Sequence, residues 1–179
     1  MQARLRGFTL IELMVALAIA ALLLLFGMPS FTTFVRNSEI RSTAESLING
    51  LRVASTQAAN LNRPVRFSLR GGAGASWTGW DITYVDEDGN TQMVQQYSRK
   101  EAGSSTKVDS GGQFSVSFSG VGRVVDQGIL NHIQQIDIDS VVSGEARPLR
   151  IIVDDLTRGL RMCDPGVAAV IPPDPRACT

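Results

Sequence analysis

Glu12 is the first residue whose chemistry needs an explanation, because it interrupts an apolar run. It is the single ionisable side chain among the 21 residues of 8–28. Placing a glutamate in hydrocarbon costs roughly 2 to 3 kcal/mol on insertion scales, and acids inside membranes commonly serve a function. We therefore expect Glu12 to have a partner.

Cys163 and Cys178 form the second candidate pair, and both lie within the last 17 residues. In an exported domain such a pair predicts a disulfide, with two unpaired surface thiols as the alternative. A closed loop of about 15 residues would contribute roughly 3 kcal/mol by restricting the unfolded chain. The only histidine, His132, is distant in sequence and no CxxC spacing occurs, so no metal site is predicted.

Motifs for catalysis are not evident in the sequence. With one histidine, no G-x-S-x-G and no P-loop, it predicts neither an enzyme nor a cofactor. The acidic turn at Asp86, Glu87 and Asp88 lacks the rest of an EF-hand loop, so we interpret it as a turn.

The chain has 17 Lys and Arg against 17 Asp and Glu, and the balance is −2 once Arg4 and Arg6 are set aside. That balance argues against a dedicated nucleic-acid binder.

The apolar run around Glu12 is long enough to span a bilayer. As a helix, residues 8–28 would extend about 31 Å at ~1.5 Å per residue, against a hydrocarbon core of roughly 30 Å. A secretory signal has a shorter apolar core and a small-residue cleavage site, and neither is clearly present. Arg4 and Arg6 place the N-terminus in the cytoplasm and the bulk of the chain outside.

A second helical pattern follows directly after the apolar run. Pro29 would remove one helical hydrogen bond and bend the axis. Beyond it, apolar residues recur at three- and four-residue steps, as in an amphipathic helix, and Pro64 cannot continue a helix. We therefore expect one long helix from about residue 8 to about residue 60. Its later apolar positions are Phe31, Phe34, Val35, Ile40, Ala44, Leu47, Ile48, Leu51, Ala54, Ala58 and Leu61.

From Val65 onward the period changes from 3.6 to 2, which predicts β-strands. In the first strand Val65, Phe67 and Leu69 alternate with polar residues, so that Arg66 and Arg70 share a wet face. The polar segment 99–112 is expected to be a mobile loop, and the proline-rich tail an irregular loop tied back by the cysteine pair. Further strands are predicted at 80–84, 91–97, 114–118, 124–125, 136–138, 149–153 and 160–162. A helix followed only by antiparallel strands predicts an α+β domain in which the sheet covers the helix's apolar stripe.

Trp77 and Trp80 are candidates for stacking on nucleic-acid bases. They are three residues apart, which on a strand would place them on opposite faces. We expect core packing or loop anchoring to be the role of one of them.

Residues Gly7 to Leu13, GFTLIEL, resemble the processing site of type IV prepilins and pseudopilins. The resemblance implies that a membrane peptidase cuts after Gly7 and methylates the new N-terminal Phe8. It also implies that Glu12 pairs with the free amine of a neighbouring subunit's first residue, and that Pro29 lies where the helix bends. The implied organisation is a leader at 1–7, a transmembrane and assembly helix at 8–29, and a periplasmic domain at 30–179.

Two later segments, VSFSGVGRVVD at 116–126 and RIIVDDLTRGLRMC at 150–163, resemble the glycine-centred strand motifs of the GspH/FimT group of minor pilins. The group includes FimU-type pilus-tip components, FimT-type proteins and the H pseudopilin of type II secretion. The resemblance implies a type IV pilin-like α+β fold with a C-terminal disulfide loop.

The function implied is that of a minor pilin at or near the pilus tip, which helps to prime pilus assembly. The implied partners are other minor and major pilins, the prepilin peptidase, the inner membrane and its assembly platform. The implied location is the inner membrane, with the domain in the periplasm, and then the assembled pilus. An H-type minor pseudopilin of type II secretion is an alternative.

DNA binding during natural transformation is a further alternative, because some FimT-type members carry a C-terminal Gly-Arg-x-Arg motif. The matching positions here are Gly159, Leu160, Arg161 and Met162, so both motif arginines are replaced. On a strand Leu160 and Met162 would point away from Arg161. Only Arg158 and Arg161 would then remain as possible DNA contacts, and otherwise these arginines solvate the sheet face.

Overall fold

The structure of the chain is a computed structural model. It describes residues 7–72, 77–99, 106–125, 132–142, 146–154, 159–167 and 174–178, and within these it describes residues 24–30 by their backbone alone. The chain divides into two compact units, Met1–Val35 and Arg36–Thr179. Each unit is described by itself below.

The N-terminal unit consists of the first part of helix α1, Leu10–Leu61, which is 52 residues long. Thr9 immediately precedes the helix, and its Oγ1 accepts a hydrogen bond from the backbone N–H of Glu12 at 3.3 Å. This is the N-cap arrangement, in which a hydroxyl satisfies one of the four backbone donors left over at a helix start. The predicted single long helix is therefore confirmed, and it continues through Pro29.

Among the residues that the structure describes, no helix has an apolar stretch of the length that crossing a membrane requires.

In the second unit, α1 buries one apolar stripe. Its members recur every three or four residues and are at most 5% exposed: Ile40, Ala44, Leu47, Ile48, Leu51, Ala54 and Ala58. Gly50 lies on the same side, where a Cβ would come within 2.9 Å of the Phe67 ring. The absence of a side chain at Gly50 thus allows the helix to approach the sheet closely.

The C-terminal end of α1 is a Schellman motif. Asn62 adopts a left-handed conformation with φ of 50°, and its N–H is directed to the carbonyl of Ala59. The N–H of Arg63 donates to the carbonyl of Ala58 at 3.3 Å. Together with Pro64, this motif ends the helix within two residues of the predicted boundary and turns the chain into the first strand.

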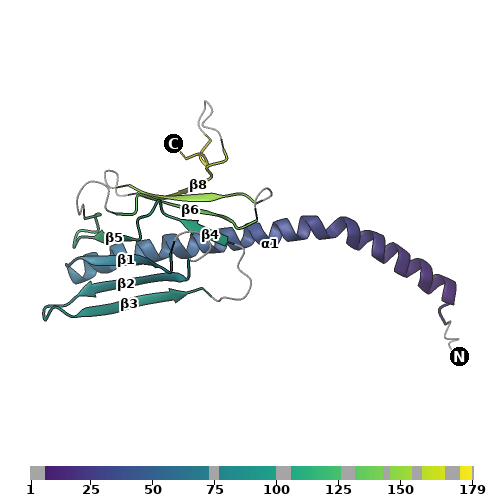
Figure 1. Cartoon of the computed structure of the whole chain (residues 1–179), viewed down its shortest axis with the longest axis horizontal. Helices are drawn as coiled ribbons and strands as arrows, with labels where there is room; N and C mark the ends of the chain where they lie inside the picture. The colour runs from purple at the N-terminus through teal and green to yellow at the C-terminus, as the bar shows by residue number, and fades with distance from the viewer. Residues whose placement is uncertain are drawn as a thin grey trace, which may run out of the picture. The chain divides into compact units, whose positions relative to one another are not determined.

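The first sheet has four antiparallel strands in the order β3-β2-β1-β5. Their bounds are β1 Val65–Arg70, β2 Gly79–Val85, β3 Thr91–Ser98 and β5 Ser115–Phe118. In β1, Val65 and Phe67 are fully buried while Arg66 and Arg70 are exposed. The alternation predicted for this strand is confirmed, and it orients the apolar face toward α1 (Figure 1).

The second sheet also has four antiparallel strands, in the order β4-β6-β7-β8. Their bounds are β4 Thr106–Asp109, β6 Gln135–Ser140, β7 Leu149–Val153 and β8 Leu160–Cys163. Ile136, Ile138 and Ile151 point inward and belong to the same hydrophobic cluster as Phe67 and the α1 stripe. One core therefore joins the helix and both sheets, which confirms the predicted α+β architecture.

Two local predictions were wrong. The segment 99–112 contains strand β4, in which Thr106 and Val108 are buried and Lys107 and Asp109 point outward. A strand with two inward residues gives almost no periodic signal, so its polar composition suggested a loop. At 124–125, by contrast, Val124 makes only an isolated bridge to Phe118.

The expectation that a tryptophan packs in the core is confirmed, whereas the expected placement of the two tryptophans on opposite faces of one strand is not. Trp77 lies before β2, and both tryptophans are buried, at 2% and 3% exposure. Their rings lie 6.4 and 5.8 Å from the ring of Tyr97, so both tryptophans reach the same tyrosine. Gly79 lies between them with a φ of 145°, which is available to glycine but rarely to other residues.

Candidate functional site

The predicted processing site lies in a short non-helical segment in front of α1. Gly7 and Phe8 are both exposed, and Phe8 reaches 84% exposure. A Cβ built on Gly7 would meet no atom within 4 Å, so a side chain at this position would have open space among the described residues. The two residues that flank the predicted cleavage bond are thus both exposed.

Glu12 occupies the first turn of α1 and is exposed. A carboxylate in this turn interacts favourably with the positive end of the helix dipole, by typically 0.3 to 1 kcal/mol at an exposed site. The spacing from Thr9 to Glu12 is that of a capping box, S/T-x-x-E, and the structure forms the half in which the Thr9 hydroxyl accepts. Thr9 was not among the residues predicted from the sequence, although this spacing is a recognisable signal for an N-cap.

The four residues Gly7, Phe8, Thr9 and Glu12 therefore lie within a stretch of six residues of the chain. Removal of the residues up to Gly7 would leave Phe8 as the first residue, with Thr9 as the N-cap directly behind it. The pairing of Glu12 with a neighbouring subunit's Phe8 stays a prediction, since a single chain does not test it. The side chain of Pro29 lies outside the described residues.

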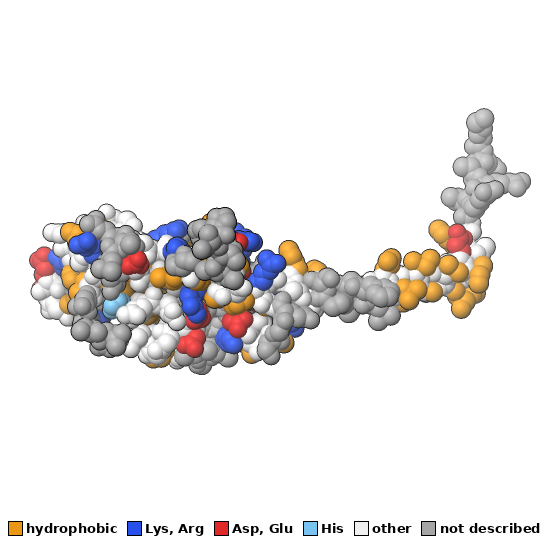
Figure 2. All heavy atoms as spheres, turned by 90° about the horizontal axis from the view of Figure 1, so that it is seen from above, with side chains coloured by type: hydrophobic (Ala, Val, Ile, Leu, Met, Phe, Trp, Pro, Cys, Tyr) orange, Lys and Arg blue, Asp and Glu red, His pale blue; other side chains and the backbone are white. Residues whose placement is uncertain are grey.

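Apolar side chains are exposed on all sides of α1 between Leu10 and Leu23. Figure 2 shows orange hydrophobic side chains along the described part of this helix, with an acidic side chain in red near its start. Leu10, Ile11 and Leu23 are each more than 60% exposed. A helix that is apolar all round requires cover by lipid or by other helices.

The predicted disulfide between Cys163 and Cys178 is confirmed. Cys163 ends strand β8 and is 3% exposed, so the bond joins the tail to the sheet at a buried position. The tail also pairs with the chain after β8, where the N–H of Asp164 donates to the carbonyl of Arg176 at 2.7 Å. Arg176 in turn contacts the carboxylate of Asp174 at 2.7 Å, and this lowers the pKa of Asp174 to about 2.

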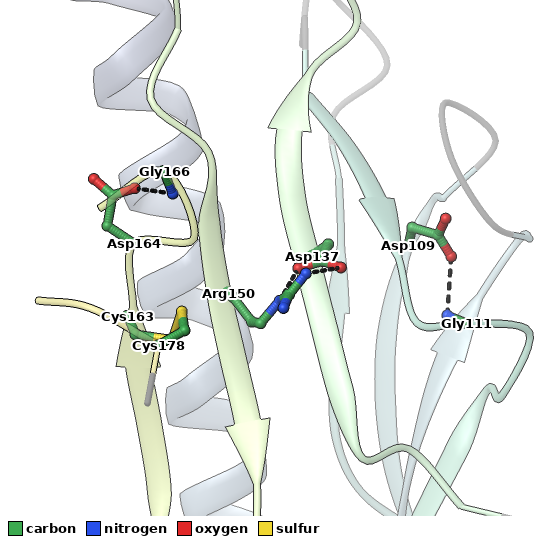
Figure 3. A network of polar contacts seen from close by, with 8 residues as sticks. All are labelled: Asp109, Gly111, Asp137, Arg150, Cys163, Asp164, Gly166 and Cys178. Carbon is green, nitrogen blue, oxygen red and sulfur yellow. Dashed lines mark hydrogen bonds and ion pairs between the residues drawn. A yellow bond between two sulfur atoms is a disulfide. The ribbon is translucent and has the colours of Figure 1, made fainter. Parts of the chain in front are cut away.

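A charged row crosses the outer face of the second sheet beside this disulfide (Figure 3). Arg150 lies in register with Asp137 on one side and Cys163 on the other. Its guanidinium donates two hydrogen bonds to the Asp137 carboxylate, at 2.5 and 3.0 Å, and the contact raises the pKa of Arg150. The sequence analysis did not single out this pair, because its two members are 13 residues apart and meet only through sheet register.

The alternation predicted for β8 is confirmed. Leu160 and Met162 pack against the core, whereas Arg161 is exposed on the opposite face. Arg158 lies outside the described residues. Of the two arginines proposed for DNA contact, the structure therefore describes only Arg161. Leu160 and Met162, which occupy the positions of the motif arginines, face the core.

Comparison with protein families gives two matches. The model for Type II transport protein GspH matches residues 43–157, and the model for the Prokaryotic N-terminal methylation motif matches residues 3–28. The first covers the domain part of α1 and most of both sheets. The second covers the processing segment with the apolar run. No curated protein matches the chain.

Solved structures with a similar fold come from two bacteria. The type IV minor pilin FimU of Pseudomonas aeruginosa has a TM-score of 0.55 at 13% identity, covering 72% of this chain and 91% of FimU. The minor pseudopilin EpsH from the type II secretion system of Vibrio cholerae has a TM-score of 0.50 at 15% identity, covering 74% of this chain and 98% of EpsH. At such identities the likeness concerns the fold alone.

Proposed function

The chain belongs to the GspH family of minor pilins and pseudopilins, and we propose that it is a minor type IV pilin, incorporated at or near the pilus tip, that helps to prime pilus assembly. The family is structural, so the proposed work is assembly through surface contacts. The observation that carries the proposal is the arrangement at the start of α1. An open Gly7, an exposed Phe8 and a first-turn carboxylate at Glu12 precede an uncovered apolar helix.

Processing after Gly7 would create an α-amino group at Phe8. Such a group has a pKa of roughly 8 and is mainly charged at neutral pH. It would sit at the positive end of the α1 dipole, which disfavours a second positive charge. In the low dielectric of lipid or packed helices an unpaired amine and an unpaired carboxylate are both costly, so the Glu12 carboxylate of the next subunit is a favourable partner.

We place residues 8–29 in the inner membrane before assembly, with the leader at 1–7 in the cytoplasm and the domain at 30–179 in the periplasm. Arg4 and Arg6 support this orientation, since positive charge is retained on the cytoplasmic side. In the fibre the same apolar helix surface would pack against other pilin helices. The prepilin peptidase and the inner-membrane assembly platform are the partners that this route requires.

The test is recovery of the chain in sheared fibres. An epitope-tagged full chain should appear in the pilus fraction in small amounts, and deletion of its gene should lower the number of assembled pili. Wild-type chain that is processed normally but never found in fibres, together with unchanged piliation after deletion, would contradict the proposal.

An H-type minor pseudopilin of type II secretion is the second candidate. The family description and the fold of EpsH favour it. The two candidates differ in the phenotype of a deletion strain. Loss of secretion with normal pili would assign the chain to the pseudopilus, whereas loss of pili with normal secretion would assign it to the pilus.

A further inference from the structure

The two sheets have four edges, and three of them are covered or charged. Along β5, residues after the strand return and donate to it, with Val125 N–H bonded to Ser117 O at 2.7 Å and Ile133 N–H to Ser115 O at 3.0 Å. The disulfide-bonded tail lies next to the end of β8. Strand β4 has only four residues, of which Lys107 and Asp109 are charged. These are the usual ways in which proteins protect sheet edges from pairing with other chains.

Strand β3 lacks most of that protection. It is the outermost strand of its sheet (Figure 1), it has eight residues, and only Val94 among them is partly covered. Its sequence, TQMVQQYS, contains no charged residue and no proline. Among the described residues, no backbone hydrogen bond outside the β2 ladder reaches β3. An uncharged free edge of this length is a template for an added strand.

One irregularity determines what can pair with this edge. The register between β2 and β3 shifts between Ile82 and Thr83, which leaves Val94 as a bulge near the middle of β3. In a symmetric antiparallel pair in which two β3 strands overlap over their full length, Val94 would lie opposite Gln95 of the other copy, so two bulges would meet at the centre. Because a bulge interrupts the ladder, a second copy is a poor partner.

An aromatic anchor flanks the half of the edge after the bulge. Tyr97 is 38% exposed, and its ring stacks on Trp80 at 5.8 Å between centroids and on Trp77 at 6.4 Å. The guanidinium of Arg99, two residues after Tyr97, lies over the Trp77 ring at 5.6 Å from its centre. A tyrosine held by two buried rings offers a rigid apolar contact, which is typical of binding hot spots.

We propose that the outer edge of β3, chiefly residues 95–98, binds an extended, uncharged segment of an adjacent and different pilin-type subunit, which adds a strand to the first sheet and places an apolar side chain against Tyr97. Main-chain hydrogen bonds to an edge supply affinity, and flanking side chains supply specificity. The inference rests on the proposed function, because assembly into a fibre is what brings such a subunit alongside.

The first test compares hydrogen exchange of the full chain in detergent and in sheared fibres. We expect the outward-pointing amides among residues 91–98 to exchange roughly tenfold or more slowly in fibres, because strand pairing protects backbone N–H groups and the other amides of β3 already face β2. Exchange at 91–98 that is equal in both states would overturn the edge proposal alone. Absence of the wild-type chain from fibres would overturn the proposed function and the edge proposal together.

The second test introduces a charge at the edge. Gln95→Lys should lower recovery of the chain in fibres about fivefold or more, which corresponds to a loss of roughly 1 kcal/mol of binding free energy. The control variant Val121→Lys should match wild type. Val121 is 72% exposed in the turn after β5, so it controls for the added charge. Thermal melting of both variants in detergent should match wild type. Equal recovery of both variants would overturn the proposal. A disulfide-linked homodimer of a Gln95→Cys variant in fibres would also overturn it, because it would show that two copies of this chain pair at the edge.

Discussion

The hydroxyl of Thr9 accepts a hydrogen bond from the backbone N–H of Glu12 at 3.3 Å, so Thr9 fixes the start of α1 directly behind Phe8. The bond lies within the processing segment. It gives Thr9 a structural role that is separate from recognition by a peptidase. After cleavage the N-cap would be the second residue of the mature chain.

Replacing Thr9 by alanine should loosen the first turn of α1. Loss of an N-cap costs about 1 kcal/mol, so the Glu12 amide of the full chain in detergent should exchange roughly fivefold faster. Thr9→Ser keeps a hydroxyl and should behave like wild type. Unchanged exchange in Thr9→Ala would mean that the bond does not stabilise the helix start.

Replacing Gly7 by valine should block processing. A branched side chain would fill the open space next to the bond that the peptidase has to reach. The expected result on a denaturing gel is accumulation of the full-length precursor. Glu12→Ala serves as the control, since it leaves the bond after Gly7 untouched. A processed band in Gly7→Val would contradict the cleavage assignment.

Replacing Glu12 by alanine should leave processing intact but reduce incorporation into fibres, because the Phe8 amine of a neighbour would then lack its counter-charge. We expect a loss of severalfold or more in sheared fibres. Glu45→Ala removes an exposed acid from the same helix and should have little effect. Equal recovery of the Glu12→Ala variant and wild type would rule out the pairing.

Opening the disulfide should destabilise the domain by about 3 kcal/mol in the chain-entropy model for a 15-residue loop. The measurement is denaturant unfolding of the full chain in detergent, with and without reductant, followed by tryptophan fluorescence. The double variant Cys163→Ala and Cys178→Ala should match the reduced wild type and should not respond to reductant. A midpoint that reductant does not change would show that the disulfide contributes nothing to stability.

DNA binding should be weak and should depend little on Arg161. The positions that would carry motif arginines, Leu160 and Met162, face the core, and the chain has no net positive charge. In a plot of log affinity against log salt concentration, each phosphate contact adds a slope of only about −0.9, so one or two arginines give a weak salt dependence. Gel-shift binding that falls steeply with salt and disappears in the Arg158→Gln, Arg161→Gln double variant would contradict this prediction and favour a transformation role.

Local pattern predicted those elements whose physical cause lies in neighbouring residues. The stripe from Ile40 to Ala58 has helical period, Pro64 forbids continuation of the helix, and Val65 with Phe67 alternates cleanly. The processing segment is likewise a short local motif. The cysteine pair was predictable because the chain contains only two cysteines, so one pairing is possible.

The tertiary structure decided what depends on residues far apart in the sequence. The division of the eight described strands into two sheets, the bidentate contact of Arg150 with Asp137 and the outer edge of β3 all follow from strand order and register. Strand β4 is visible only through its pairing with β6, because Thr106 and Val108 alone carry no period. Such pairings are set by long-range contacts in one shared core, so the short strands remained ambiguous until that core placed them.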